Sequence, residues 1–173
     1  MMVAVAGSPD RPVIVDRQRI QISDTAQPYH VARDLGAIRG RVFLEECRRA
    51  SNALAVSALE SAIKRMGGDR VHGCAVLMGS GRLSASLEAT LASHAAIHTA
   101  EGVFFREIVI VVAESCGLHV LRIKEKELLD LASREFKTSI DDLTRGLNDL
   151  SKVLGPPWTQ DHKFAALAGW LVL

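Results

Sequence analysis

The sequence MVAVAGSPDRPVIVDRQRIQI, residues 2–22, decides the fold that we expect. Met2–Ala6 is a short apolar run typical of a strand, and it is followed by the turn residues Gly7-Ser8-Pro9-Asp10. Pro12 stands at the first position of a second strand, where a strand tolerates proline. Apolar and polar residues then alternate to about Ile22. We therefore expect an antiparallel hairpin in this stretch.

Helical and strand patterns alternate after the hairpin. Ser23–Asp34 is polar, and we expect it to be irregular, with Pro28-Tyr29-His30 in a loop. Apolar runs at Val71–Met78 and His119–Ile123 predict strands of a parallel pair, because helical segments separate them. The predicted helices run from about Ala37 to Met66, from near Ser84, and over His94–Cys116, Lys124–Phe136, Ser139–Leu154 and Thr159–Leu173.

Composition narrows the class of protein. A chain of 173 residues has the length of one domain, and we expect residues 1–173 to form a single α/β domain. Lys and Arg number 21 against 20 Asp and Glu, so no global field attracts the chain to a polyanion, although a local basic groove remains compatible with this balance. The longest apolar stretches are far shorter than a membrane span. We therefore expect no membrane association and a cytoplasmic location.

The block from Gly79 to Lys124 and the last helix carry a family resemblance. In the block, Ala113-Glu114-Ser115-Cys116-Gly117 ends a helix, and Leu118-His-Val-Leu-Arg-Ile-Lys124 follows it as a strand. In the last helix, an acid, Asp161, precedes Ala166-Leu167-Ala168. Together with the element order, these segments resemble the ribonuclease-H-like fold, and in particular its Holliday-junction-resolvase (RuvC-like) branch. The resemblance implies an α/β fold with a mixed sheet, in which the N-terminal hairpin precedes parallel strands and helices flank them.

The resemblance also implies a catalytic apparatus that this sequence carries only in part. Nucleases of this fold hold two divalent metals, Mg²⁺ or Mn²⁺, between carboxylates on the first strand, after the fourth strand and at the last helix. The hairpin here resembles the second and third strands of that sheet, so the acid-bearing first strand is expected to be missing. Asp161 is the one acid in a matching place. We therefore expect an atypical or degenerate relative of the resolvase-type nucleases.

One constellation carries chemistry independently of the resemblance. His94, His98 and Glu101 are offset by 0, 4 and 7 residues, so on a helix they lie within about 40° of one another. Two imidazoles and a carboxylate on one face can form part of a metal site, and a carboxylate near a histidine can equally set its tautomer for proton transfer. A half-buried packing seam that continues to Phe105 is the structural alternative.

The candidate site residues follow from these patterns. We take Glu101, Asp161 and His98 as candidate catalytic residues, and His94, His98 and Glu101 as candidate metal ligands, with Mg²⁺ or Mn²⁺ favoured over Zn²⁺. Candidate ligand-binding residues are Arg82 in the Gly79-Ser80-Gly81-Arg82 loop, Lys163 beside Asp161, and His30.

Three functions remain open from the sequence. The first is a resolvase-related protein that binds or acts on structured nucleic acid. The second is a non-catalytic interaction domain that forms a homo-oligomer through an uncovered hairpin edge. The third is a metal-dependent enzyme that uses His94, His98 and Glu101.

Overall fold

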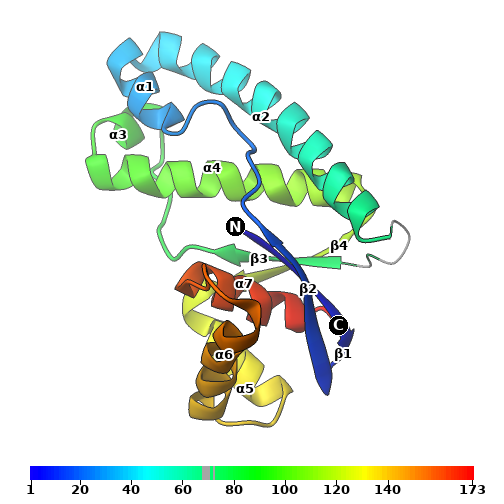
Figure 1. The fold of residues 1–173 in the computed structure, drawn as a ribbon. Coiled ribbons are helices and arrows are strands. Elements are labelled where there is room, and N and C mark those ends of the chain that lie inside the picture. The colour runs from blue at the N-terminus through cyan, green and yellow to red at the C-terminus, as the bar shows by residue number, and fades with distance from the viewer. Residues whose placement is uncertain (68–70, 72) are drawn as a thin grey trace. The chain divides into compact units, whose positions relative to one another are not determined.

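The computed structural model describes residues 1–67, 71 and 73–173, which form a mixed α/β structure (Figure 1). Its strands are β1 (Met2–Ser8), β2 (Arg11–Gln18), β3 (Gly73–Met78) and β4 (His119–Lys124). Its α-helices are α1 (Pro28–Leu35), α2 (Ala37–Arg65), α3 (Leu87–Leu91), α4 (His94–Ser115), α5 (Leu128–Glu135), α6 (Ile140–Leu154) and α7 (Gln160–Trp170), with a short 3₁₀ turn at Glu125–Glu127. In this part of the chain, no helix is both long and apolar enough to cross a bilayer.

The strands pair as the sequence predicted, but they do not form one sheet. β1 and β2 make the antiparallel hairpin, and β3 pairs with β4 in parallel from Gly73↔His119 to Met78↔Lys124. Among the described residues, hydrogen bonds divide the strands into two separate two-stranded sheets. The expected single mixed sheet is therefore wrong for this part of the chain, and the ribonuclease-H-like fold stays a prediction.

Contacts divide the chain into two compact units, each built from discontinuous segments. The strand unit contains residues 1–20, the described residues among 69–78, and residues 119–173. The helical unit contains residues 21–67 and 79–118. The single domain expected over residues 1–173 stays a prediction, and each unit is described by itself.

Helix α7 joins the two sheets of the strand unit. It packs against β1 and against β3, and close packing on both sides depends on glycine. A Cβ at Gly169 would lie 2.9 Å from Cγ2 of Val5, and one at Gly73 would lie 2.6 Å from Cγ1 of Val172. The apolar core of this unit includes residues of α7 itself. It is formed by Ile123, Leu128, Ala132, Leu143, Leu147, Leu167 and Ala168.

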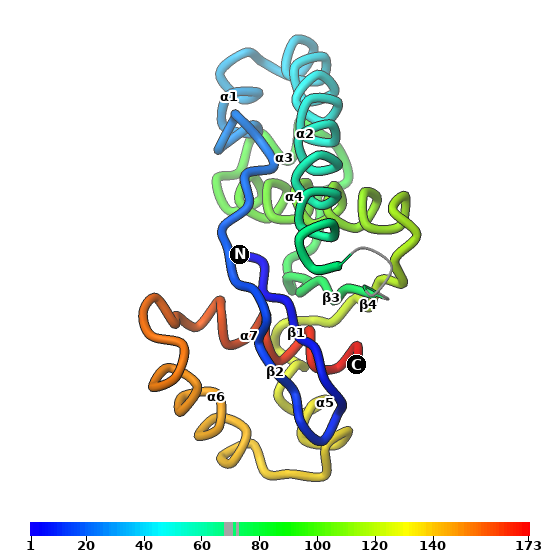
Figure 2. Tube along the Cα trace, turned by 45° about the vertical axis from the view of Figure 1, so that its right-hand side comes forward, coloured from blue at the N-terminus to red at the C-terminus, as the bar shows by residue number. Residues whose placement is uncertain are grey.

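Two side chains tie the hairpin to the C-terminal helices. The Arg17 guanidinium donates hydrogen bonds to the carbonyl oxygens of Gly155 at 2.8 Å and Pro157 at 2.7 Å, and also to that of Leu154. A cation at this position also complements the negative end of the α6 dipole. The indole of Trp170 donates to the carbonyl oxygen of Pro9 at 2.8 Å. The first and last elements of the chain are therefore held side by side, as Figure 2 shows.

Four helices, α1 to α4, make up the helical unit. The long helices α2 and α4 pack together around Phe104, Ile108 and Cys47, and α1 and α3 pack around Ala32 and Leu91. α4 begins after Ser93, whose hydroxyl accepts a hydrogen bond from Ala96 N at 3.3 Å. This cap fixes the first turn of α4, where His94 lies, and His98 follows one turn later.

Of the segment Ser23–Asp34, which the sequence predicted to be irregular, residues 23–27 are irregular, but helix α1 occupies the rest from Pro28 onward. Pro28 occupies the first turn, where its missing N–H costs nothing and its fixed φ favours a helix. Pro28 and Ala32, one turn apart, are buried, while the polar residues between them face outward or toward α4. The polarity of the segment concealed this short buried stripe, and a helix of eight residues depends on such tertiary packing for stability.

Candidate metal centre

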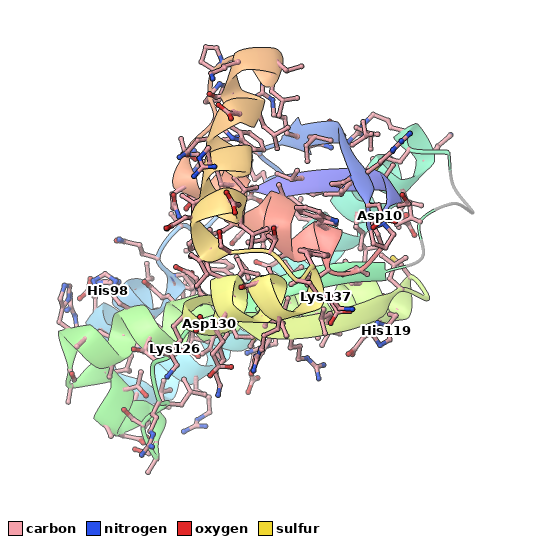
Figure 3. All side chains as sticks on the ribbon, turned by 90° about the horizontal axis from the view of Figure 1, so that it is seen from below. Asp10, His98, His119, Lys126, Asp130 and Lys137 are labelled. Atoms are coloured by element: carbon pink, nitrogen blue, oxygen red, sulfur yellow. The ribbon has the colours of Figure 1, made fainter. Side chains whose placement is uncertain are left out.

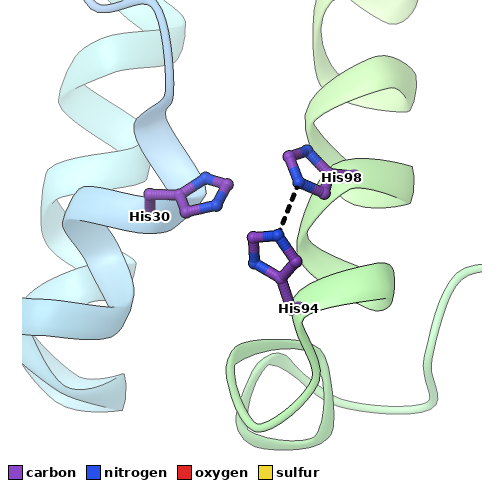
Figure 4. Close-up of side chains that lie close together, drawn as sticks. All are labelled: His30, His94 and His98. Atoms are coloured by element: carbon purple, nitrogen blue, oxygen red, sulfur yellow. Dashed lines mark hydrogen bonds between the residues drawn. The ribbon is translucent and has the colours of Figure 1, made fainter.

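Three histidines from two helices meet in the helical unit. His94 and His98 lie one turn apart on α4, and their Nε2 atoms are 3.0 Å from each other. His30 faces them from α1 (Figure 4), with its ring centroid 5.3 Å from that of His94 and 5.0 Å from that of His98. One ring nitrogen from each histidine lies within 4.8 Å of the others, a grouping that could hold a metal ion.

Glu101, one turn further along α4, lies behind the histidines and is 8% exposed. Its Oε1 accepts hydrogen bonds from the backbone N–H groups of Tyr29 at 3.2 Å and His30 at 3.4 Å. The same oxygen lies 2.9 Å from Nδ1 of His30. Gln27, the residue before α1, supplies no side-chain cap. Glu101 therefore caps α1 from another helix and, at the same time, holds the His30 ring.

The Glu101 carboxylate sets the free nitrogen of His30 and lies near His98. Because an ionised carboxylate only accepts hydrogen bonds, Nδ1 of His30 is the donor and Nε2 keeps its lone pair. The second oxygen, Oε2, lies 3.8 Å from Nδ1 of His98. A carboxylate on this side of the ring favours a proton on Nδ1, as in His30. Metal-ligating histidines in proteins are oriented by such carboxylates. Glu101 is therefore placed to orient ligands rather than to be one.

The spacing of the nitrogens fits one metal ion of ordinary size. Two nitrogen ligands at about 2.0–2.1 Å from a tetrahedral Zn²⁺ lie roughly 3.3 Å apart. The 3.0 Å between the His94 and His98 nitrogens is close to this separation, and His30 is within a side-chain adjustment of it. The side chain of His98 is 53% exposed and projects from α4 (Figure 3). A fourth ligand, such as water, can therefore approach the cluster from solvent.

Tyr29 lies next to His30 on α1 and points into the apolar side of the unit. Its ring packs edge-on against Phe104, with a centroid separation of 6.0 Å. Burial raises the pKa of the Tyr29 phenol; Arg48 opposes this effect, and Glu107 and Glu101 add to it. α1 thus contributes a buried aromatic anchor from one residue and a candidate ligand from the next.

The remaining predicted site residues are not among the clustered histidines. Arg82 is exposed in the segment between β3 and α3, within the helical unit. Asp161 and Lys163 lie in the first turn of α7, in the strand unit, with Asp161 exposed and Lys163 half-buried. In the same turn, Nδ1 of His162 accepts the Thr159 backbone N–H at 3.2 Å, which makes this turn a helix cap.

The two-metal centre that the ribonuclease-H-like resemblance implies stays a prediction. Such a centre needs several carboxylate oxygens directed at two hard cations. Oε1 of Glu101 is already engaged by three N–H donors, and Asp161 belongs to the other unit. The chemistry of the described residues near Glu101 is that of imidazole ligands.

Sequence reasoning named two of the three clustered histidines as candidate metal ligands and did not name His30 as one. The spacing of His94, His98 and Glu101 indicated a shared helix face, and the structure brings these residues together. His30 was taken as a loop residue and a candidate for ligand binding. The signal that could have found it is Pro28 at a helix start, which would place His30 in a first turn beside the half-buried Tyr29.

No known protein family, curated protein or solved structure matches this chain. Its function is therefore argued from the geometry of its own residues.

Proposed function

We propose that this protein binds one divalent transition-metal ion between α1 and α4, with His30, His94 and His98 as its ligands. The observation that carries the proposal is the double engagement of Glu101. The buried Glu101 carboxylate contacts Nδ1 of His30 and lies near Nδ1 of His98. The Nε2 atom of each histidine is therefore directed away from this carboxylate. A surface cluster of unrelated histidines needs no such support behind it.

The donor set favours Zn²⁺ among the biological metals. Imidazole suits Zn²⁺, Cu²⁺, Ni²⁺ and Fe²⁺, whereas Mg²⁺ and Mn²⁺ prefer carboxylate, carbonyl and water oxygens. The sequence favoured Mg²⁺ or Mn²⁺ because the ribonuclease-H-like resemblance implies divalent cations held by carboxylates. Because Oε1 of Glu101 already accepts from three N–H groups, the available ligands are mainly imidazole nitrogens. Such ligands favour Zn²⁺ over Mg²⁺ or Mn²⁺.

Three ligands leave a tetrahedral ion with one open position. Catalytic zinc sites have this composition, with three protein ligands and a water or substrate in the fourth position, whereas structural sites are closed by four protein ligands. The exposure of His94 and His98 keeps that position open to solvent. The proposed centre therefore supports Lewis-acid chemistry on a small substrate. Binding of structured nucleic acid and homo-oligomer formation stay predictions from the sequence.

Metal titration of the purified chain, after removal of bound metals by a chelator, tests the proposal. We expect Zn²⁺ to bind with one ion per chain in isothermal titration calorimetry, and Co²⁺ to give the intense visible absorption of a tetrahedral site. His30→Ala, His94→Ala and His98→Ala should each weaken Zn²⁺ binding at least about tenfold, whereas Mg²⁺ should give no saturable heat.

His119→Ala is the matched control, because His119 is an exposed histidine on β4 in the other unit. This variant should bind Zn²⁺ as the unaltered chain does. Equal Zn²⁺ affinity in all four variants, or no Zn²⁺ binding by the unaltered chain, would show that the cluster is not a metal site. Circular dichroism of each variant establishes that the helices are retained.

A further inference from the structure

A second candidate site lies in the strand unit and has no part in the metal centre. It is an apolar cavity of about 290 Å³ bounded by the hairpin, α6 and α7. Apolar cavities of roughly 150 Å³ are known to accept a molecule as large as benzene. The apolar residues that line most of this cavity include Val5, Ile14, Leu143, Leu147, Leu150 and Trp170.

The cavity walls are fixed by hydrogen bonds rather than by a ligand. Arg17 of β2 holds the carbonyl groups that follow α6, and Trp170 of α7 holds the Pro9 carbonyl in the hairpin turn. The Trp170 ring also stacks on Phe136 at a centroid separation of 4.1 Å. The space between these tethered elements is therefore preformed, which lowers the entropic cost of binding.

Gly146, in the middle of α6, contributes to the open space. It lines the cavity, and a Cβ at this position would meet no other atom within 4 Å. Glycine in a helix interior lowers helix stability by about 1 kcal/mol relative to alanine, so Gly146 makes α6 less stable than alanine would. Its neighbours one turn away in each direction, Asp142 and Leu150, also line the cavity.

The negative charge of one lining residue, Asp142, favours apolar ligands that carry a positive charge. Asp142 is the one charged residue among those that line the cavity, and no Lys, Arg or His is among them. The Ser139 hydroxyl, and then Arg145, hold the pKa of the Asp142 carboxyl below its usual range, so the group is ionised at neutral pH. Its pair with Arg145 is largely exposed to solvent, and exposed pairs of this kind are weak.

We propose that this cavity binds a small apolar primary amine of about the size of phenylethylamine, with the hydrocarbon between α6, α7 and the hairpin and the ammonium group at Asp142. The lining disfavours an apolar carboxylate, because the anion would meet the Asp142 charge without a compensating cation among the lining residues.

Three probes of nearly equal shape test the proposal on the full chain: 2-phenylethylamine, 2-phenylethanol and phenylacetate. Binding is followed by intrinsic tryptophan fluorescence, to which Trp158 and Trp170 both contribute, together with ligand-observed NMR at pH 7. We expect the amine to bind most tightly, the alcohol about tenfold more weakly and phenylacetate not at all. Asp142→Asn should bring the amine to the affinity of the alcohol.

Gly146→Leu fills the cavity without an initial clash and should abolish binding of all three probes. Val153→Leu is its control, because Val153 is 85% exposed on the same helix and should leave binding unchanged. Amine binding that survives Gly146→Leu would refute the site, and equal affinities for amine and alcohol would refute the role of Asp142. Zn²⁺ binding by the histidines, measured on the same samples, reports on the other unit and so keeps the two proposals distinguishable.

Discussion

Oε1 of Glu101 lies 2.9 Å from Nδ1 of His30, and the same oxygen accepts the backbone N–H of His30. A single carboxylate oxygen thus fixes both where α1 begins and how its histidine is turned. Helix position and ring orientation are coupled, so a change at Glu101 should affect the stability of the helical unit and its affinity for metal together.

Glu101→Gln keeps the shape of the side chain but removes its charge. We expect the free energy of unfolding to fall by about 1–3 kcal/mol, because hydrogen bonds to a charged acceptor are replaced by weaker ones. Zn²⁺ affinity should fall about 10–100-fold, the effect usual for groups that orient metal-bound histidines. Urea denaturation and calorimetric titration measure the two effects. Glu107→Gln is the control, because Glu107 pairs with Arg48 near the surface and should change stability by less than about 1 kcal/mol.

Tyr29 is the single tyrosine in the chain, so its ionisation can be followed directly by ultraviolet absorption near the tyrosinate band. Burial raises the pKa of its phenol, and the midpoint should therefore lie above the usual value of about 10. Since the folded state holds the proton more firmly, the associated stability is fully present below the unfolded pKa and is lost as pH rises through the folded pKa. A midpoint at or below that of a tyrosine peptide would contradict the buried position of this ring.

Arg17→Met should weaken the strand unit. The substitution keeps most of the apolar stem but removes hydrogen bonds to the carbonyl groups of Leu154, Gly155 and Pro157. We expect a loss of roughly 1.5–3 kcal/mol in the free energy of unfolding, because these bonds have a charged donor. Arg19→Met, at an exposed position on the same segment, should stay within about 0.5 kcal/mol. Similar losses in the two variants would mean that the tether contributes little.

Two glycines in the helices of the strand unit should respond to alanine in opposite directions. A Cβ at Gly169 would press on Val5 at 2.9 Å, so Gly169→Ala should destabilise the packing of α7 on β1, by about 1 kcal/mol or more after the helix gain is included. Gly146→Ala meets open space and should stabilise α6 by up to about 1 kcal/mol. Thermal denaturation of both variants measures the difference. Stabilisation by Gly169→Ala would contradict the close approach of α7 to β1, and destabilisation by Gly146→Ala would contradict the open space beside α6.

Local patterns predicted most elements of the fold. The turn cluster at Gly7-Ser8-Pro9-Asp10 predicted the hairpin, and β1 and β2 confirm it, although β2 ends at Gln18 rather than near Ile22. The long helix expected from Ala37 to Met66 is α2, and it ends at Arg65. These elements carry their own start and stop signals, which is why a single sequence suffices to locate them. Residue 72, in the strand predicted at Val71–Met78, lies outside the described residues.

Contacts between distant segments could not be predicted in this way. Hydrophobic periodicity carries no information about which strand pairs with which, so the separation of the hairpin from the β3–β4 pair was not foreseen. His30 and Glu101 are likewise far apart in the sequence, and neither residue type indicates its partner. The polar segment that contains α1 is helical because Glu101 supplies its cap and buried neighbours support it, and both are tertiary effects.

The tie between the two ends of the chain also bears on how the protein acquires its structure during synthesis. The hairpin leaves the ribosome before its partners α6 and α7, which are translated after the helical unit. A two-stranded hairpin alone is at best marginally stable in water, so β1 and β2 should not be stably folded until α7 emerges. The helical unit, whose segments end at residue 118, has its whole sequence available earlier. Co-translational folding should therefore begin in the helical unit, and the strand unit should fold only after α7 has emerged.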